Sequence, residues 1–421
     1  MRSNLWKKKR PTPYWMVVVL LVFSGCGCSE KGNGADKIDA GIDASFLDAG
    51  DGGGVDADAT PEPPDGTIQH DFCDKAFFKL PIDGPTQATY RLSIWGDKIV
   101  YSVTSPEDIT KRDVHLMDLT TCTEKQITYS GKGLGAGIDN EKIAWVDSRN
   151  MAEEPYHCGD LFVYYLNSRE EEKLTINPEC KGGVTTNGNL LSYRQAESTS
   201  SDRTDLILTR FGSGEEEIIV PGTWLPISPD LSERYLVFGA QSEDSTSMGR
   251  DAYYYDLQEE TLHRIPESSD VFCEGVTVSG DWLMYAGNYY SMQMPFKVAL
   301  YNIPEKRHIA LSPQEDIIPS IALHGNLAAW TTMIYSGTHY MGPVDMEMYD
   351  VNQETRRRLT KTSGHLRAIA MFFPYLVMLQ ARYYDGNNFK NDFYVAHLVK
   401  LGITDAQGNL LAGDGAIEQP D

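Results

Sequence analysis

The sequence predicts an all-β protein: a seven-bladed β-propeller of four-stranded antiparallel blades, preceded by an export signal and a disordered acidic tether. Three observations support this prediction. A strand-like unit recurs seven times at a nearly constant period, a second unit recurs in step with it, and the N-terminal part differs in composition from the rest.

A basic stretch, an apolar run and small residues open the chain, in that order. The basic stretch is Lys7–Arg10, the apolar run is Tyr14–Phe23, and Ser24–Cys26 follows. This order is typical of a secretory signal peptide. Because a membrane-spanning helix needs roughly twenty apolar residues, a permanent anchor helix fits this shorter run less well. Residues 1–25 are therefore predicted to be a signal peptide.

The residues Phe23–Cys26 resemble the lipobox of bacterial lipoproteins, in which the signal is cut before the cysteine and the cysteine is acylated. The resemblance implies that Cys26 is lipidated and that its acyl chains hold the protein at the cell envelope, at the outer membrane. The side of that membrane is left open. Plain secretion, with Cys26 and Cys28 left as thiols, is the alternative.

Residues 26–72 are predicted to be a flexible tether that begins with the lipidated cysteine. Asp-Ala-Gly units recur at Asp39–Gly41 and Asp48–Gly50, and apolar residues are sparse. Such a segment cannot bury enough apolar surface to offset the entropy lost on ordering. The spacing of its aspartates does not match a calcium-binding EF-hand loop.

The first repeated unit is a turn residue followed by a strand-like run, which ends at positions 101, 145, 193, 238, 285, 330 and 378. The second unit is usually an acid followed by a strand-like run, and it begins at Asp113, Asp160, Asp205, Asp251, Lys297, Asp345 and Asp392. Two series in step at a period of roughly 46 residues, with short strands between them, are typical of propeller blades. A pair of β-sandwiches fits this regularity less well, and the apolar runs lack the 3.6-residue period of helical solenoids.

The run Ile227–Asp230 leading into Leu236–Phe238 resembles the blade motif of TolB-like propellers, and Met348–Val351 resembles an outer part of such a blade. The resemblance implies a propeller over residues 73–403 and a scaffold or protein-binding role. It implies no active site, because the motif residues are turn and packing residues. Residues 404–421 are expected to be a C-terminal tail or closing strand.

Two segments compete to supply the last strand of the seventh blade. One is Phe77–Leu80 near the N-terminus and the other is Asn409–Leu411 near the C-terminus. The N-terminal segment is preferred, because Phe77 and Phe78 otherwise have no apolar environment. The last dozen residues are expected to be frayed in either case.

The export signal permits disulfides. Cys158 and Cys180 flank a predicted hairpin at facing positions, and are therefore expected to form one bridge. Cys73, at the start of the closing strand, is expected to pair with Cys122 in the outer turn of the first blade. Cys273 is expected to be a buried thiol. No Cys-x-x-Cys pair is present to hold zinc, and no metal site is predicted.

Aromatic residues gather in the long segments between the second and third strands of several blades. The predicted binding face consists of Tyr156, His157, Tyr289, Tyr290, Tyr335, His339, Tyr340, Tyr383, Tyr384 and Phe389. Aromatic loops on a rigid scaffold suit carbohydrate stacking or a protein interface. Packing of these rings against neighbouring blades is the alternative.

Catalytic motifs are absent: the sequence has no Gly-x-Ser-x-Gly, no His-Glu-x-x-His and no phosphate-binding glycine loop. No catalytic residue and no cofactor is predicted. The 60 acids against 37 Lys and Arg give a net charge of −23, which excludes a typical nucleic-acid binder. The sequence therefore predicts a monomeric, non-enzymatic scaffold that binds an envelope protein. The alternative is a glycan-binding or glycan-cleaving propeller that uses the aromatic loop face.

Overall fold

The structure is a computed structural model. Its contacts divide the chain into residues 1–60 and 61–421, and every residue that the structure describes lies in the second unit. The described residues are 67–82, 92–105, 107–108, 110–150, 158–175, 179–196, 204–212, 215–241, 249–268, 272–288, 296–311, 320–333, 344–360, 366–384, 388–413 and 417. The predicted signal peptide, Cys26 and nearly all of the predicted tether lie outside these residues.

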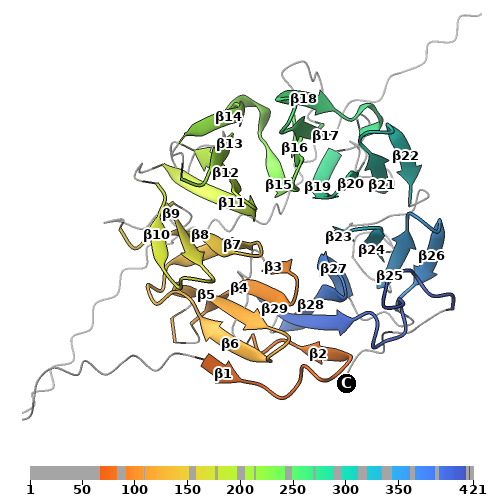
Figure 1. Cartoon of the computed structure of the whole chain (residues 1–421), viewed down its shortest axis with the longest axis horizontal. Coiled ribbons are helices and arrows are strands. Elements are labelled where there is room, and N and C mark those ends of the chain that lie inside the picture. The colour runs from red at the N-terminus through yellow and green to blue at the C-terminus, as the bar shows by residue number, and fades with distance from the viewer. Residues whose placement is uncertain are drawn as a thin grey trace, which may run out of the picture. The chain divides into compact units, whose positions relative to one another are not determined.

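The strands form seven antiparallel sheets, the blades of a propeller, and the first strand of each blade lies nearest the centre of the ring (Figure 1). Blade 1 contains β3 (Leu92–Trp95), β4 (Lys98–Thr104), β5 (Arg112–Asp118) and β6 (Thr123–Gln126), and blade 2 contains β7 (Gly133–Ile138), β8 (Lys142–Asp147), β9 (Asp160–Tyr165) and β10 (Glu171–Lys173). Blade 3 contains β11 (Cys180–Asn187), β12 (Leu190–Ala196), β13 (Asp205–Arg210) and β14 (Glu216–Val220), and blade 4 contains β15 (Ile227–Leu231), β16 (Tyr235–Ala240), β17 (Asp251–Asp256) and β18 (Thr261–Arg264). Blade 5 contains β19 (Phe272–Ser279), β20 (Trp282–Asn288), β21 (Phe296–Asn302) and β22 (Arg307–Ala310), and blade 6 contains β23 (Ile321–His324), β24 (Leu327–Met333), β25 (Val344–Asp350) and β26 (Thr355–Arg358). Blade 7 contains β27 (Leu366–Phe372), β28 (Tyr375–Tyr384), β29 (Asn388–His397) and β2 (Phe77–Lys79).

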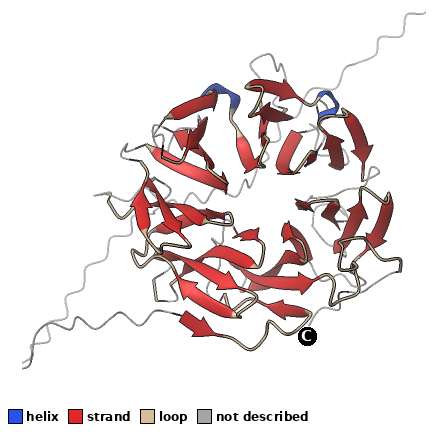
Figure 2. Cartoon of the chain, viewed as in Figure 1, coloured by secondary structure: helices blue, strands red, loops and turns tan. Residues whose placement is uncertain are grey.

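The predicted seven-bladed all-β architecture is confirmed. Within the described ranges, the helices are two short 3-10 turns, η1 (Gly222–Trp224) and η2 (Pro266–Ser268) (Figure 2). None of the helices in that part of the chain has the length and apolarity needed to cross a bilayer.

The second strand of a blade is buried on both faces because each sheet is covered by a neighbour on either side. Every residue of β8 and of β16 is buried, which explains their continuous apolar runs. By contrast, every residue of β10, the outer edge strand of blade 2, is exposed. In the described part of the ring, seven apolar clusters lie between successive blades, including the one between blades 7 and 1.

The acids that recur at the start of the third strand bind the fourth strand of the same blade. Asp160 forms an ion pair with Lys173 (Oδ2 to Nζ, 2.7 Å) and Asp251 forms one with Arg264 (Oδ2 to Nε, 2.8 Å). In blade 1, Asp113 instead accepts a hydrogen bond of 2.8 Å from the Thr128 hydroxyl. In these blades the acid of the second repeat is therefore structural, because it connects the outer edge of the blade to the third strand.

The N-terminal segment closes the ring, as the sequence predicts. β2 pairs with β29, with Phe78 opposite Val395, so that the last blade has the order β2-β29-β28-β27. Phe78 also belongs to the apolar cluster that blades 7 and 1 share. The first and last parts of the propeller thus form one sheet.

The segment that follows β29 packs on blade 6 and does not close the ring. Arg357 of β26 donates hydrogen bonds from Nη1 to the carbonyls of Gly402, Ile403 and Leu411, at 2.9, 3.0 and 3.1 Å. Ile417 is 2% exposed, and its amide donates to the Leu359 carbonyl at 2.7 Å. These residues are ordered by blade 6, in contrast to the frayed tail that their polar sequence suggests.

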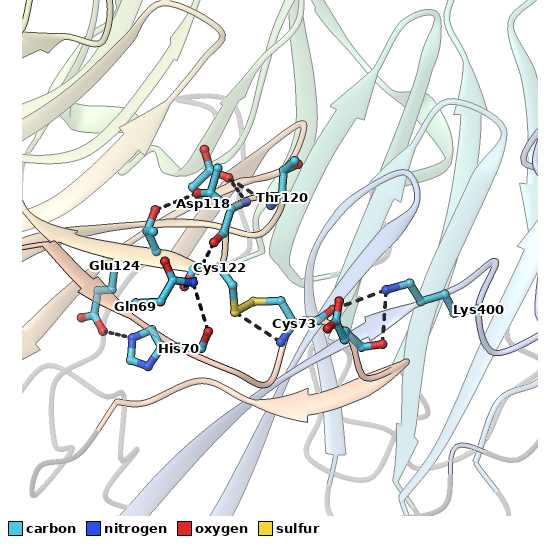
Figure 3. The surroundings of a disulfide bond; sticks show 11 residues. Gln69, His70, Cys73, Asp118, Thr120, Cys122, Glu124 and Lys400 are labelled. Atoms are coloured by element: carbon cyan, nitrogen blue, oxygen red, sulfur yellow. Dashed lines mark hydrogen bonds and ion pairs between the residues drawn. A yellow bond between two sulfur atoms is a disulfide. The ribbon is translucent and has the colours of Figure 1, made fainter.

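An additional strand precedes the closing strand. β1 (Thr67–Gln69), which the composition assigns to the tether, pairs with β6 and becomes the fifth strand of blade 1. The predicted Cys73–Cys122 disulfide lies directly after it, with a Cα–Cα distance of 5.6 Å (Figure 3). Lys400 of blade 7 donates to the Cys73 carbonyl at 3.4 Å. This junction connects the N-terminal segment to both blades that meet at the closure.

The other cysteine predictions also agree with the structure. Cys158 and Cys180 form a disulfide with a Cα–Cα distance of 3.8 Å. Cys273 is a buried free thiol, and burial raises its pKa to about 12. At neutral pH this thiol is therefore protonated and unreactive.

Candidate functional site

The innermost strands of the seven blades surround a central channel. Its volume is about 780 Å³, and its lining includes residues from β3, β11, β15, β19, β23 and β27, together with Ile138 of β7. Cavities that bind small ligands usually measure roughly 300–1,000 Å³. The channel is therefore large enough for one or two sugar-sized rings.

One side of the channel carries most of its polar side chains, together with Pro229, Leu231, Val276 and Val278. Blades 3, 4 and 5 line it with Thr185, Thr186, Asn187, Ser228, Asp230, Ser232, Thr277 and Ser279. Hydrogen bonds between blades hold several of these side chains in place. The Thr277 hydroxyl donates to Asp230 Oδ2 at 2.6 Å, and the Asn187 Nδ2 donates to the Leu231 carbonyl at 3.2 Å. The Ser279 hydroxyl accepts a bond of 2.8 Å from the Gly325 amide, which leaves its own hydrogen for another acceptor.

The opposite side of the channel is apolar. Blades 6, 7 and 1 line it with Ile321, Ala322, Leu323, Ile369, Ala370, Met371, Leu92 and Ile94. At one end of this side, three half-buried rings follow one another around the channel. The ring centroids of His324 and Phe372 are 4.0 Å apart, and those of Phe372 and Trp95 are 5.1 Å apart. We call His324, Phe372 and Trp95 the aromatic rim.

The residues of the rim occupy one equivalent position in their blades. Each is the last residue of a first strand and lies opposite the first residue of the second strand; Trp95 faces Lys98 and His324 faces Leu327. The same position in blades 3 and 5 holds Asn187 and Ser279. A glycine with a positive φ follows Trp95, Asn187, Ser279 and His324, for example +59° at Gly96, and allows the tight turn into the second strand, whereas Phe373 follows Phe372. The turn fixes the direction of the side chain before it.

Electrostatics keep the aromatic rim uncharged near neutral pH. Burial lowers the pKa of His324 below its ordinary value, so that the neutral ring predominates. Arg234, a cation in the lining of the channel, is paired with Asp256 at 2.8 Å. In the described residues, no group of three or more His, Cys, Asp or Glu is arranged to hold a metal ion.

The residues predicted to form the binding face lie largely outside the described structure. This applies to Tyr156, His157, Tyr289, Tyr290, Tyr335, His339 and Tyr340. Tyr383 and Phe389 lie opposite each other on β28 and β29, and Tyr384 follows on β28. The predicted face therefore stays a prediction.

Sequence analysis missed the channel. A usable signal was present, because the residues at this position directly precede the turns of the first repeated unit: Trp95 precedes Gly96, Asn187 precedes Gly188, Ser279 precedes Gly280, His324 precedes Gly325 and Phe372 precedes Phe373. Only the ring brings these positions together, since they are separated by a whole blade in the sequence.

No protein-family model matches the sequence. No curated protein matches it either. The fold, however, is similar to that of solved structures. The oligogalacturonate lyase of Vibrio parahaemolyticus has a TM-score of 0.52 at 14% identity, over 79% of this chain and 98% of that one. The β-propeller domain of the Trilobed protease of Pyrococcus furiosus also has a TM-score of 0.52, at 12% identity, over 72% of this chain and 93% of that one.

TolB from Acinetobacter baumannii is a looser match, with a TM-score of 0.41 at 16% identity over 62% of this chain and 63% of that one. At such identities these likenesses concern the fold alone, and the looser one supports no further argument. The seven-bladed propeller implied by the resemblance to TolB-like proteins is nevertheless present in the structure.

The prediction that the chain is not an enzyme was wrong, because the propeller architecture does not exclude catalysis. It relied on a propeller without a recognisable catalytic motif. An oligogalacturonate lyase has the same fold over 98% of its own chain, so an enzyme can be built on this scaffold. The fold is compatible with catalysis as well as with binding.

Proposed function

We propose that this protein is a lipid-anchored envelope propeller that binds a neutral saccharide in its central channel. The observation that supports this most strongly is the division of the channel into an apolar side with the aromatic rim and an opposite side of hydroxyl and amide groups. A sugar ring has a matching division, because its C–H groups form an apolar face and its hydroxyls lie along the edge. Such a ring stacks on Phe372 or Trp95 while its hydroxyls bond to Asn187 and Ser279.

The charge of the protein favours a neutral sugar over an acidic one. The chain carries a net charge of −23, and its channel lining includes Asp230, Glu233 and Asp281. A polyanionic saccharide would need cations in the channel to offset this repulsion. The lyase from Vibrio parahaemolyticus acts, by its name, on oligogalacturonate, which supports a saccharide as the ligand class but not its charge.

The location follows from the N-terminal sequence. Lipidation of Cys26 would hold the propeller at a bacterial envelope, where glycans are abundant ligands, through a segment of Asp, Ala and Gly. Binding of an envelope protein by the aromatic loop segments is a second hypothesis. It remains a prediction, because those segments lie outside the described residues.

A glycan array tests the proposal. Fluorescently labelled mature protein is expected to bind neutral glycans in preference to uronic-acid glycans at physiological salt. Saturation-transfer NMR of a bound glycan then identifies the ring protons in contact with aromatic side chains. Failure to bind any neutral glycan, or exclusive binding of acidic ones, would contradict the proposal.

A further inference from the structure

Among the described residues, Arg194 is a cation that forms no ion pair with an acid. It lies on β12, two residues before the strand ends at Ala196. Its Nε atom is buried and has no hydrogen-bond partner. Within the part of the chain that the structure describes, its guanidinium group takes part in no hydrogen bond or ion pair. Arg264 differs, because it is paired with Asp251.

The side chain of Arg194 lies on the face of blade 3 that is directed toward blade 4. Arg194 is paired across the sheet with Leu206, and side chains four residues apart on a strand, such as Leu190, share its face. Leu190 and Leu206 belong to the apolar cluster that also contains Phe238 and Ala240 of blade 4. The guanidinium group is therefore at the interface of the two blades, near the end of β12 at Ala196.

An open space adjoins this group. On its other side Arg194 is paired with Gly182 of β11, and a Cβ added to Gly182 would have no atom within 4 Å. Because paired residues of antiparallel strands point to the same face, the missing side chain leaves room beside Arg194. Burial, and then the charge of Arg250, lower the pKa of Arg194. Arg194 thus adjoins an open space, whereas Arg250 lies close to the carboxylate of Glu274 on blade 5.

We propose that Arg194 binds a small oxyanion, either a carboxylate or a phosphate group, between blades 3 and 4. A buried cation is unfavourable unless it is paired. A guanidinium group matches carboxylate and phosphate oxygens through two parallel hydrogen bonds. Because Arg250 also interacts with other groups, the proposal depends on Arg194. It concerns a site separate from the channel and is independent of the saccharide hypothesis.

Thermal unfolding of the mature protein in sodium phosphate, sodium acetate and sodium chloride at equal ionic strength tests this site. A ligand that binds only the folded state raises the Tm, here by about 2 °C or more at saturation. The rise is expected in phosphate or acetate relative to chloride, and the more effective salt identifies the anion class. Arg194→Met is expected to abolish the rise. Arg307→Gln, which removes an arginine paired with Glu305 on blade 5, is the matched control and is expected to keep it.

The stability in chloride alone provides a second readout. Arg194→Met removes an unpaired buried cation, and is expected to be at least as stable as the parent when no oxyanion is present. A clear loss of stability in chloride would mean that Arg194 already has a protein partner, and would overturn the proposal. The proposal is also overturned if the parent shows no rise, or if Arg194→Met keeps it.

Discussion

Lys79 of β2 and Asp392 of β29 form an ion pair with 2.7 Å between Nζ and Oδ1. The pair has the same position in blade 7 as Lys173 and Asp160 in blade 2. The N-terminal strand therefore reproduces the role of a fourth strand, down to the cation that binds the acid of the third strand. This equivalence explains how a segment that precedes all other blades completes the last one.

Replacement of Lys79 by Met should destabilise the closure. The Asp392 side chain is 5% exposed and would lose its cation, whereas the Lys79 side chain is 38% exposed and partly screened by water. We expect a loss of about 1–2 kcal/mol in the free energy of unfolding, measured by urea denaturation. Lys173→Met in blade 2 is the matched control and should cost a similar amount. An unchanged stability in Lys79→Met alone would contradict the closure by β2.

The two disulfides should contribute unequally to stability. Cys73–Cys122 spans 49 residues and Cys158–Cys180 spans 22. In the chain-entropy model, a cross-link over the longer loop restricts the unfolded chain more, by about 0.7 kcal/mol for these lengths. The double variant Cys73→Ala/Cys122→Ala should therefore unfold at lower urea than Cys158→Ala/Cys180→Ala. The reverse order would show that loop length does not decide how much the disulfide in Figure 3 stabilises the protein.

The carboxylate of Glu124 predicts a dependence of stability on pH. Burial raises the pKa of Glu124, but hydrogen bonds with His115 and His70, together with the His115 charge and the nearby Tyr101 hydroxyl, outweigh burial and lower it. A carboxylate whose pKa is lower in the folded than in the unfolded state stabilises the fold above its unfolded pKa of about 4.5, and this stabilisation is lost as the pH falls.

Glu124→Gln should therefore be less stable than the parent at pH 6 and should lose less stability on acidification to pH 3.5. Urea titrations at the two pH values measure both quantities. Glu141→Gln, which changes a carboxylate that is 61% exposed, is the control and should behave like the parent. An equal loss of stability between pH 6 and pH 3.5 in the parent and in Glu124→Gln would contradict the assignment of this acid sensitivity to Glu124.

The anchor predicts a modification at one cysteine. Radioactive or clickable palmitate should label the wild-type chain and Cys28→Ser, while Cys26→Ser should remain unlabelled and leave the membrane fraction. Retention of Cys26→Ser in membranes that have been washed with high salt would rule out the lipid anchor.

The repeat was predictable because tight turns require particular residues. Gly96, Gly188, Gly280 and Gly325 have φ values of +59°, +58°, +55° and +58°, which favour glycine, and so they recur in the sequence. The closing strand was predictable because Phe77 and Phe78 are adjacent apolar residues that need burial. By contrast, β1 carries three exposed side chains, and only its pairing with β6 makes it a strand. No apolar pattern marks such a segment.

The channel was less predictable for a different reason. Its two sides arise from blades that are far apart in the sequence, and the repeated turn that follows Trp95 or Phe372 does not show which of these positions meet in the ring. The burial of the apolar residues near the C-terminus was also not predictable, because Leu410 and Ile417 are isolated in a polar segment. They are buried only because blade 6 offers them a surface.

The central claim is that the aromatic rim binds a neutral saccharide, and isothermal titration calorimetry on the parent and Phe372→Ala tests it most directly. Tyr129→Ala, which removes a ring that is 66% exposed outside the channel, is the control. For a glycan identified on the array, we predict that Phe372→Ala weakens binding by about tenfold, since a stacked ring contributes roughly 1–1.5 kcal/mol. Tyr129→Ala should bind like the parent. Equal affinity for the parent and Phe372→Ala would contradict the account.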